Sequence, residues 1–270
     1  MTVSTPLMPH GLDALGLLLD RVAERQRADF GQLDSEAKAD GSLITACDRW
    51  SDAALVEGLA QLYPGEGVLS EEGSQRVPST DAFWVVDPLD GTTNFAAGIP
   101  YWAISIARFE RGVPVLAVLD VPPLRQRIVA VRGGGAWRKG KVLAPPSTRP
   151  EVAGCASLCS RSIGVLQKLP HRRFPGKIRL LGVASLNLVS VAMGQTVSAL
   201  EATPKIWDLA AAWLVLEELQ CPIRWLMRDP AHLEAGEDLS RVDFPVLAAR
   251  DDETLIRFGP WAEALVDGSR

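Results

Sequence analysis

A short apolar run, Phe83–Val86, leads directly into an acidic segment that reads Asp-Pro-Leu-Asp-Gly-Thr-Thr-Asn-Phe over residues 87–95. Apolar runs of this length are typical of a buried strand. We expect Asp87 at the end of that strand, with Pro88 closing the hydrogen-bond ladder because proline has no N–H group. Asp90 follows three residues later, so that two carboxylates can converge across one tight turn. The fold must therefore bury a strand and keep carboxylates at its end.

The same segment carries the groups that a metal and a phosphate need. Carboxylates, together with the Leu89 carbonyl that the turn frees, are hard oxygen ligands that suit Mg²⁺ or Mn²⁺. Gly91 permits unusual backbone angles or the close approach of a ligand. If a helix or turn begins at Thr92, its free N–H groups favour a bound phosphate. Asp, Pro, Gly and Asn also make ordinary turns, so a turn without a metal remains an alternative at this point.

Further acidic residues support the metal interpretation. Glu71 and Glu72 follow the apolar pair Val68-Leu69, sixteen residues before Asp87, and two strands that end at one edge could bring Glu71 beside Asp87. Asp208 precedes a strongly apolar helical segment, either as an N-cap worth about 1 kcal/mol or as another metal ligand. No Cys or Ser nucleophile motif lies nearby, which favours direct attack by water over a covalent intermediate. Histidines stand in unrelated stretches, at His10, His171 and His232.

Hydrophobic periodicity predicts layered α and β structure rather than a regular βαβ winding. Helices are expected at residues 11–26, 49–62, 184–194 and 207–219, and strands at 83–86, 102–109, 113–121 and 128–131. A polar loop that contains Lys38 separates the first two helices. Prolines over residues 140–153 suggest a boundary, with residues 1–145 carrying the main acidic motif and 146–270 carrying Asp208, in one compact catalytic unit.

Composition excludes several classes of protein. The chain has 270 residues, of which 47% are hydrophobic and 23% charged, as in globular proteins, and its net charge of −5 argues against a nucleic-acid polymer as partner. The longest uncharged stretch, residues 180–200, holds too many polar groups for a membrane span. Without a signal-peptide pattern, a soluble cytoplasmic protein is expected. The cysteines, expected to be buried free thiols, are Cys47, Cys155, Cys159 and Cys221.

Residues 87–95 resemble the D-P-[IL]-D-G-T-x-N-F signature of the inositol monophosphatase family of Mg²⁺-dependent, lithium-sensitive phosphatases. Three other segments agree with that family in order and spacing: Thr45–Asp48 with its T-x-x-D pattern, the acidic pair Glu71-Glu72, and Trp207–Ala212 with its W-D signature. The resemblance extends from about Lys38 to Glu217. It implies a layered α-β-α-β-α sandwich shared with fructose bisphosphatases, and a homodimer.

The resemblance also implies roles for individual residues. A first metal would be held by Glu71, Asp87 and the Leu89 carbonyl, a second by Asp87, Asp90 and Asp208, with two or three Mg²⁺ ions (Mn²⁺ is possible) per site. In catalysis, Thr92, supported by Asp48, would help Glu71 polarise the attacking water, and Lys38 would lie on a mobile loop near the metals. The residues that would bind substrate are Asp90, Gly91, Thr92, Ala184, Glu201 and Asp208. Glu201 would accept a hydrogen bond from a substrate hydroxyl. The alternative is that Glu201 is a solvated charge at a helix end.

Departures from the family pattern cluster on the substrate side and leave every metal position intact. They occur at Val183, Gln195–Val197, Leu200 and Gln220–Pro222. Thr93 favours a small phosphate ester such as inositol phosphate or a similar polyol or sugar phosphate. The alternatives are a fructose-1,6-bisphosphatase, a histidinol-phosphatase, a 3′-phosphoadenosine nucleotide phosphatase, or a non-catalytic metal-binding interaction protein on the same fold.

Overall fold

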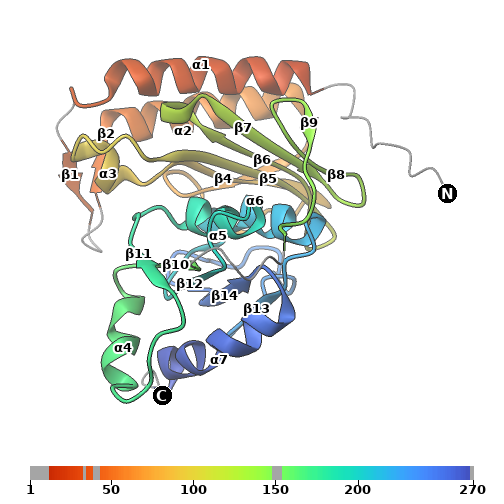
Figure 1. The fold of residues 1–270 in the computed structure, drawn as a ribbon. Coiled ribbons are helices and arrows are strands. Elements are labelled where there is room, and N and C mark those ends of the chain that lie inside the picture. Colours follow the sequence, from red (N-terminus) through yellow and green to blue (C-terminus); the bar gives the residue numbers. More distant parts are fainter. Residues whose placement is uncertain (1–11, 33–34, 39–42, 148–153, 268–270) are drawn as a thin grey trace.

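The computed structural model of the protein describes residues 12–32, 35–38, 43–147 and 154–267, and shows two stacked sheets with helices on both sides and between them. In Figure 1, α1 and α2 cover the upper sheet, α5 and α6 lie between the sheets, and α4 and α7 lie against the lower one. The predicted layered α+β class is therefore confirmed.

The first sheet, seven-stranded over the described residues, carries the acidic segment. Its order is β3-β4-β5-β6-β7-β8-β9, antiparallel except for the parallel pair β3 and β4. The strands are β3 (Gly67–Ser70), β4 (Ala82–Asp90), β5 (Ala103–Glu110), β6 (Val113–Val121), β7 (Gln126–Val131), β8 (Gly135–Arg138) and β9 (Lys141–Val142). Because β3 and β4 run in the same direction, both end at one edge of the sheet, as the sequence predicts.

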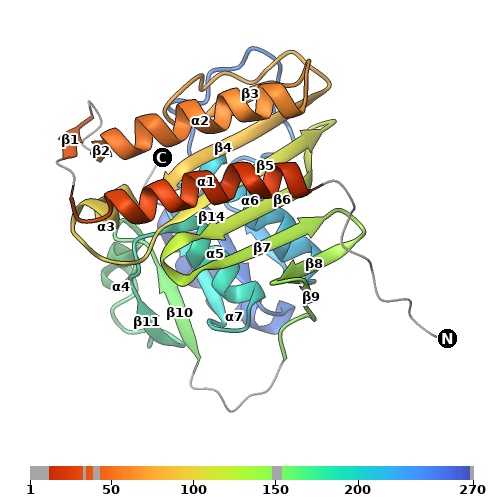
Figure 2. The ribbon, with the colours of Figure 1, turned by 90° about the horizontal axis from the view of Figure 1, so that it is seen from above.

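Two long helices cover the outer face of this sheet. Helices α1 (Asp13–Asp29) and α2 (Ala46–Leu62) lie side by side across it, as Figure 2 shows. Both are amphipathic: α1 buries Leu15, Leu19 and Val22, and α2 buries Leu55 and Leu59, in one apolar cluster with residues of β4, β5, β6 and β7. This packing fixes the helix ends that approach the acidic segment.

The second sheet, five-stranded over the described residues, has the order β11-β10-β12-β14-β13. Its strands are β10 (Cys155–Leu158), β11 (Lys177–Arg179), β12 (Ser198–Glu201), β13 (Ile223–Trp225) and β14 (Val246–Ala249). Strands β10 and β12 are parallel, whereas β14 is antiparallel to β12 and β13. The ends of β10, β12 and β13 and the beginning of β14 therefore lie along the same edge.

The remaining elements complete the layers. Helices α5 (Ala184–Ala192) and α6 (Ile206–Glu218) are apolar because they are packed between the sheets, and α4 (Val165–Lys168) and α7 (Asp252–Val266) pack together outside. The short pieces are β1 (Ser35–Ala37), β2 (Leu43–Thr45), α3 (Thr92–Ala96) and 3₁₀ turns at Pro122–Leu124 and Ser162–Gly164. The long uncharged stretch thus contains a buried helix, as predicted. No described helix combines the length and hydropathy that crossing a bilayer requires.

The structure corrects two local expectations. Pro88 does not end the strand, because β4 continues to Asp90; its pairing with β5 shifts between Asp87 and Asp90, which places one extra residue in β4 as a β-bulge. The polar loop expected around Lys38 contains β1, which pairs with β2. Residues 39–42 and 148–153 lie outside the described residues, so the rest of that loop and part of the predicted boundary are not seen.

The cysteine prediction holds in part. All four cysteines are free, which agrees with the absence of a disulfide framework. Cys47 and Cys221 are buried, but Cys155 and Cys159 are only partly buried, so the expectation of burial is wrong for these two. Cys159 is partly exposed because it follows β10 at the sheet edge, where it lines a pocket.

Candidate active site

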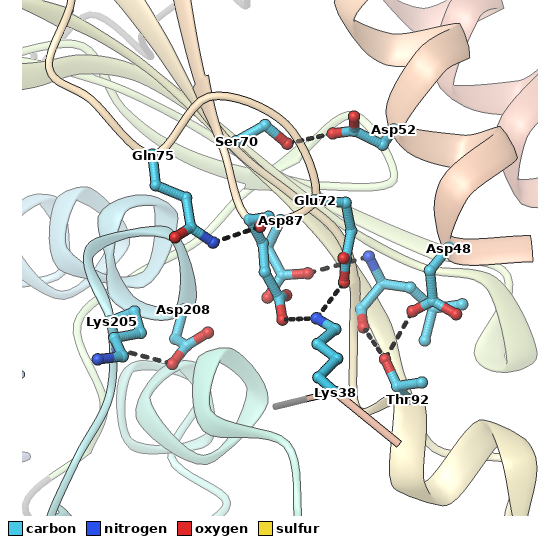
Figure 3. Close-up of polar contacts among 12 residues, drawn as sticks. Lys38, Asp48, Asp52, Ser70, Glu72, Gln75, Asp87, Thr92, Lys205 and Asp208 are labelled. Atoms are coloured by element: carbon cyan, nitrogen blue, oxygen red, sulfur yellow. Dashed lines mark hydrogen bonds and ion pairs between the residues drawn. The ribbon is translucent and has the colours of Figure 1, made fainter. Parts of the chain in front are cut away.

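Three carboxylates meet where the two halves of the chain face each other. One oxygen each from Glu71, Asp87 and Asp208 lies within 4.8 Å of the other two. Glu71 comes directly after β3, and its backbone N–H donates to Val86 O at 3.1 Å, which holds it beside β4. Asp208 reaches the same space from the first turn of α6 (Figure 3). The predicted convergence of these three side chains is therefore present.

The carboxylates carry more negative charge than their surroundings neutralise. Asp87 is buried; its Oδ1 accepts from Leu89 N at 2.9 Å, but its Oδ2 has no hydrogen-bond partner among the described residues. Burial raises the pKa of Asp87, and the charges of Glu71, Asp90 and Asp208 raise it further. Burial likewise raises the pKa of Asp208, helped by Asp90 and Glu71. A buried, unpaired carboxylate oxygen among like charges fits a divalent cation. Such an ion would pair with the oxygen and reduce the repulsion between the carboxylates.

Asp90 stands slightly apart from this cluster. Its Oδ2 accepts from the backbone N–H of Ser185, at 2.7 Å, in the first turn of α5. Burial raises its pKa to about 6, although the hydrogen bonds from Ser185 work in the opposite direction. Asp90 thus differs from Asp87 and Asp208, whose backbone donors lie within three residues in the chain, because its donor comes from a distant segment. It links the acidic segment to the second half of the chain.

Thr92 has the environment expected of a residue that orients water. Its Oγ1 lies 2.6 Å from Asp48 Oδ1 and 3.2 Å from Leu89 O. Since a hydroxyl has one proton, the shorter contact identifies Asp48 as its acceptor. Asp48 is itself fixed, because its Oδ2 accepts from Thr45 N at 2.8 Å and from Thr45 Oγ1 in a capping box at the start of α2. The lone pairs of the Thr92 hydroxyl remain available to another donor.

Lys38 lies at the acidic cluster in the described structure. Its Nζ donates to Glu71 Oε1 at 2.8 Å. It also contacts Glu72 Oε1, as Figure 3 shows. Burial alone would lower the pKa of Lys38, but the two carboxylates raise it overall. Burial, followed by the charge of Glu71, raises the pKa of Glu72 to about 7. The sequence analysis identified the acidic pair Glu71-Glu72 but gave no role to Glu72. In the structure, Glu72 forms an ion pair with Lys38.

A pocket of about 200 Å³ adjoins the carboxylates. Of the residues predicted to bind substrate, Asp90, Ala184, Glu201 and Asp208 line it. Glu201 is the last residue of β12 and only 2% exposed, so the alternative of a solvated charge at a helix end is wrong. Burial raises the pKa of Glu201 to about 8, whereas the hydrogen bond from Asn187 Nδ2, at 2.8 Å, works in the opposite direction.

Several other pocket residues escaped sequence reasoning, among them Asn187, Cys159 and Arg161. No motif marks them, because they reach the pocket only through the pairing of β10 with β12 and the packing of α5 on that sheet. His171 and His232 are exposed, and His10 lies outside the described residues. None of the described histidines lines the pocket.

Two expectations about helix starts can also be compared with the structure. Asp208 is not the N-cap of α6; it is three residues after the N-cap residue Lys205, whose backbone N–H donates to Asp208 Oδ2 at 2.8 Å. A short helix, α3, does begin at Thr92. Its N-cap, Gly91, has φ +105°, and a Cβ there would lie 2.8 Å from Val183 Cγ2. Only glycine fits this position without strain.

Comparison with known families decides what kind of protein this site belongs to. The model of the inositol monophosphatase family matches residues 12–235, most of the chain. The chain belongs to the inositol monophosphatase family. The members of this family are phosphatases. The protein is therefore a metal-dependent phosphoric monoester hydrolase.

Individual relatives of this family member agree. A histidinol-phosphatase of Mycobacterium tuberculosis is 35% identical over 215 residues, which cover 74% of this chain and 82% of the relative. An inositol-1-monophosphatase of Rhizobium meliloti is 35% identical over 202 residues, which cover 70% and 76%. Among solved structures, the Thermotoga maritima IMPase has a TM-score of 0.78 at 25% identity and covers 94% of this chain and 98% of that chain. The relatives thus share the fold and the phosphatase class but differ in named substrate.

Proposed function

We propose that the protein hydrolyses inositol monophosphate, or a similar polyol or sugar phosphate, by direct attack of water, with Mg²⁺ or Mn²⁺ in two or three sites. The observation that carries this proposal is the partly buried cluster of Glu71, Asp87 and Asp208, which lies beside a pocket lined by the buried carboxyl group of Glu201. A cluster of acceptors binds the ions, and the adjoining pocket receives the rest of the ester.

The chain supplies the ligands and the positioning groups. Glu71, Asp87 and the Leu89 carbonyl would hold one ion, and Asp87, Asp90 and Asp208 another. Ions bound in this way would lower the pKa of water and stabilise the leaving oxygen. Because the Thr92 hydroxyl donates its hydrogen bond to Asp48, the hydroxyl oxygen can accept a hydrogen bond from the attacking water and so orient it. Glu71 then polarises that water, and Lys38 offsets the charge of Glu71 until an ion binds.

The roles on the substrate side are proposed from the same family resemblance, at the positions that match it. The backbone of Gly91 and Thr92 would hold the phosphate, and Ala184, Glu201 and Asp208 would contact the remainder of the substrate. The Glu201 carboxyl group, fixed by Asn187, can accept a hydrogen bond from a polyol hydroxyl. Val183 and Leu200, where the chain departs from the family, are fully or almost fully buried next to these residues.

The wider setting rests on family resemblance. We propose a cytoplasmic homodimer that lithium inhibits, with no nucleic-acid polymer or membrane as partner. The division at residue 145 is proposed on the distribution of the site: Glu71 and Asp87 come from the first part, and Asp208 and Glu201 from the second. The two parts form one catalytic unit, since neither carries the whole set of ligands.

The test is phosphate release from a panel of esters with Mg²⁺ and after chelation. The panel contains inositol 1-phosphate, fructose 1,6-bisphosphate, histidinol phosphate and 3′-phosphoadenosine 5′-phosphate. Chelation should abolish turnover. Asp87→Asn should lower turnover by more than about 100-fold. Mutating a residue that only hydrogen-bonds to a metal ligand typically lowers activity by about 10- to 100-fold, and losing the ligand itself should lower it further.

Asp81→Asn, an exposed aspartate ahead of the same strand, is the matched control and should retain full activity. The circular-dichroism spectrum of Asp87→Asn should match that of the parent protein. Full activity after exhaustive chelation would overturn the metal mechanism. Turnover of histidinol phosphate or the nucleotide in clear preference to inositol 1-phosphate would replace the proposed substrate.

A further inference from the structure

The edge of the second sheet that ends in the substrate pocket continues beyond it. Val246, the first residue of β14, pairs with Glu201 on one side and with Trp225, the last residue of β13, on the other. The residues that follow β13 and precede β14 therefore lie next along the edge from Glu201. Whatever gathers there is adjacent to the substrate pocket.

A larger cavity, of about 660 Å³, is found at that place. Its walls include Val165 and Lys168 of α4, Met227 after β13, and residues 241–243 before β14. It shares Arg161 and Thr203 with the substrate pocket, so the two hollows adjoin at this pair of residues. A ligand that begins at the carboxylate cluster can thus extend past Arg161 into the larger cavity.

The charges change sign along this path. The charged residues lining the substrate pocket are Asp90, Glu201, Asp208 and a single cation, Arg161. Those lining the larger cavity are Arg161, Lys168, Arg228, Arg241 and a single acid, Asp243. A substrate that spans both hollows therefore meets acidic groups and their metals at one end and basic groups at the other.

Most of these basic groups are not neutralised. Among the described residues, Arg161 has one hydrogen-bond partner, Thr203 Oγ1 at 2.8 Å, and forms no ion pair. Lys168 donates to the carbonyl of Ala264 at 2.7 Å, also without a carboxylate. By contrast, Arg228 is paired with Glu237 at 2.7 Å.

The acid in the cavity does not offset these charges. Asp243 is already paired with Lys205, at 2.9 Å. Arg241 is exposed and forms no direct hydrogen bond or ion pair with a described residue, although its charge contributes to the lowered pKa of Asp238. Arg161, Lys168 and Arg241 thus leave an excess of positive charge in a partly apolar cavity.

We propose that this cavity binds a second phosphate group of the substrate, so that the preferred esters carry two phosphates on one molecule. The inference rests on the proposed phosphatase function and moves the preferred substrate, within the polyol and sugar phosphates, from inositol monophosphate to an ester with a second phosphate. A guanidinium group offers five N–H donors in a planar arrangement that matches phosphate oxygens, and Arg161 uses one of its nitrogens for Thr203. The apolar walls, with Met227 67% exposed, suit the carbon skeleton between the phosphates.

Matched pairs of substrates test the proposal. Fructose 1,6-bisphosphate is compared with fructose 1-phosphate, and adenosine 2′,5′-bisphosphate with adenosine 2′-phosphate. Arg161→Met should lower kcat/KM for the bisphosphate of at least one pair by about 10- to 100-fold more than for its monophosphate, the range expected for a lost hydrogen bond to a charged group. The responding pair tells whether a sugar or a nucleotide carries the second phosphate. Arg173→Met, an exposed arginine outside both hollows, is the control and should leave the ratios unchanged.

A binding measurement separates this proposal from the hydrolytic one. In chelator the carboxylate cluster repels anions, so calorimetric binding of inorganic phosphate reports on the basic cavity. Arg161→Met and Arg241→Met should each weaken this binding by at least 10-fold relative to the parent protein and Arg173→Met. If no ester is hydrolysed but this pattern holds, the proposed function fails and the anion site stands. Equal phosphate binding by all four proteins, or an equal loss of kcat/KM on both members of each pair, would overturn the second-phosphate site.

Discussion

Asn94 and Phe95 close the acidic segment and hold it rigid. Asn94 Nδ2 donates to Tyr101 O at 2.9 Å and to Leu181 O at 2.8 Å, which ties the segment to the chain just before α5. Phe95 packs edge-on against Trp102, with ring centroids 5.0 Å apart. Since several separate contacts fix the backbone of residues 87–95, the site's ligands are positioned before any ion or substrate binds. Such preorganisation is what a site requires when geometry determines its rate.

Thr92→Ala should separate positioning of water from binding of metal. Without the hydroxyl group that Asp48 orients, turnover should fall by about 10²-fold or more, the scale of general acid–base assistance. The Mg²⁺ concentration for half-maximal activity should change little, because the metal ligands remain. Thr93→Ala is the matched control, since Thr93 is the exposed neighbour in the same helix. Trapping a phosphothreonine at residue 92 would contradict the role in orienting water and indicate a covalent nucleophile instead.

Glu201→Ala should discriminate between substrates. A substrate hydroxyl left without its partner in a buried pocket costs about 1–3 kcal/mol, so KM for a polyol phosphate should rise by roughly 10- to 100-fold. An aryl phosphate has no such hydroxyl and should be affected by less than about threefold. Glu24→Ala, at an exposed residue of α1 outside both hollows, serves as the control. Equal losses on both substrates would show that Glu201 supports the structure rather than the polyol.

At the scale of elements, features set by local sequence pattern could be predicted, whereas features set by long-range strand pairing could not. Amphipathic periodicity predicts α1 and α2, because the apolar residues of a buried helix face recur every three or four positions in the sequence. The parallel ends of β3 and β4 could also be expected, and with them the position of Glu71 beside Asp87. The bulge at Pro88 could not be predicted, because it arises from the register in which β4 pairs with β5. The position of Glu201 in a strand could not be predicted either, because it depends on the pairing of β12 with β10 and β14.

Helix α1 reaches this bulge through one buried side chain. Gln26 Nε2 donates to Pro88 O at 2.8 Å and to Ser51 Oγ at 3.1 Å, and its Oε1 accepts from Trp102 Nε1 at 3.0 Å. The Pro88 carbonyl therefore has a partner on a different layer of the fold. Gln26 itself is completely buried.

Gln26→Met should destabilise the protein by about 1–3 kcal/mol for each buried partner left unsatisfied. Because Pro88 lies between two proposed metal ligands, Asp87 and Leu89, the Mg²⁺ requirement for activity should rise as well. Gln61→Met, at an exposed position of α2, should leave both properties within error. Urea unfolding and Mg²⁺ titration of activity measure the two effects. A variant as stable as the parent would show that the Pro88 carbonyl finds water or another donor.

At the scale of the whole molecule, the site joins two structural halves. Asp87 lies in the first sheet and Glu71 directly follows one of its strands, whereas Asp208 lies in the first turn of α6, which packs between the sheets and contacts β4, β5 and β6. An ion bound to all three would therefore connect the upper sheet to the middle layer. Anything that binds only the folded state adds to its stability, by about 2.7 kcal/mol when the ligand is at 100 times its Kd.

Mg²⁺ should accordingly raise the Tm of the parent protein, and Asp208→Asn should remove most of that increase. In chelator the same variant should be at least as stable as the parent, because burial and the charges of Asp90 and Glu71 raise the pKa of Asp208 and make its ionised form costly to the folded state. The asparagine oxygen can still accept from Lys205 N, so the start of α6 is preserved. Asp81→Asn, remote from the cluster, should keep the full Mg²⁺-dependent increase measured by calorimetry. If Asp208→Asn retained that increase, the ion would be bound by the first sheet alone, and the carboxylate of α6 would serve only to begin its helix.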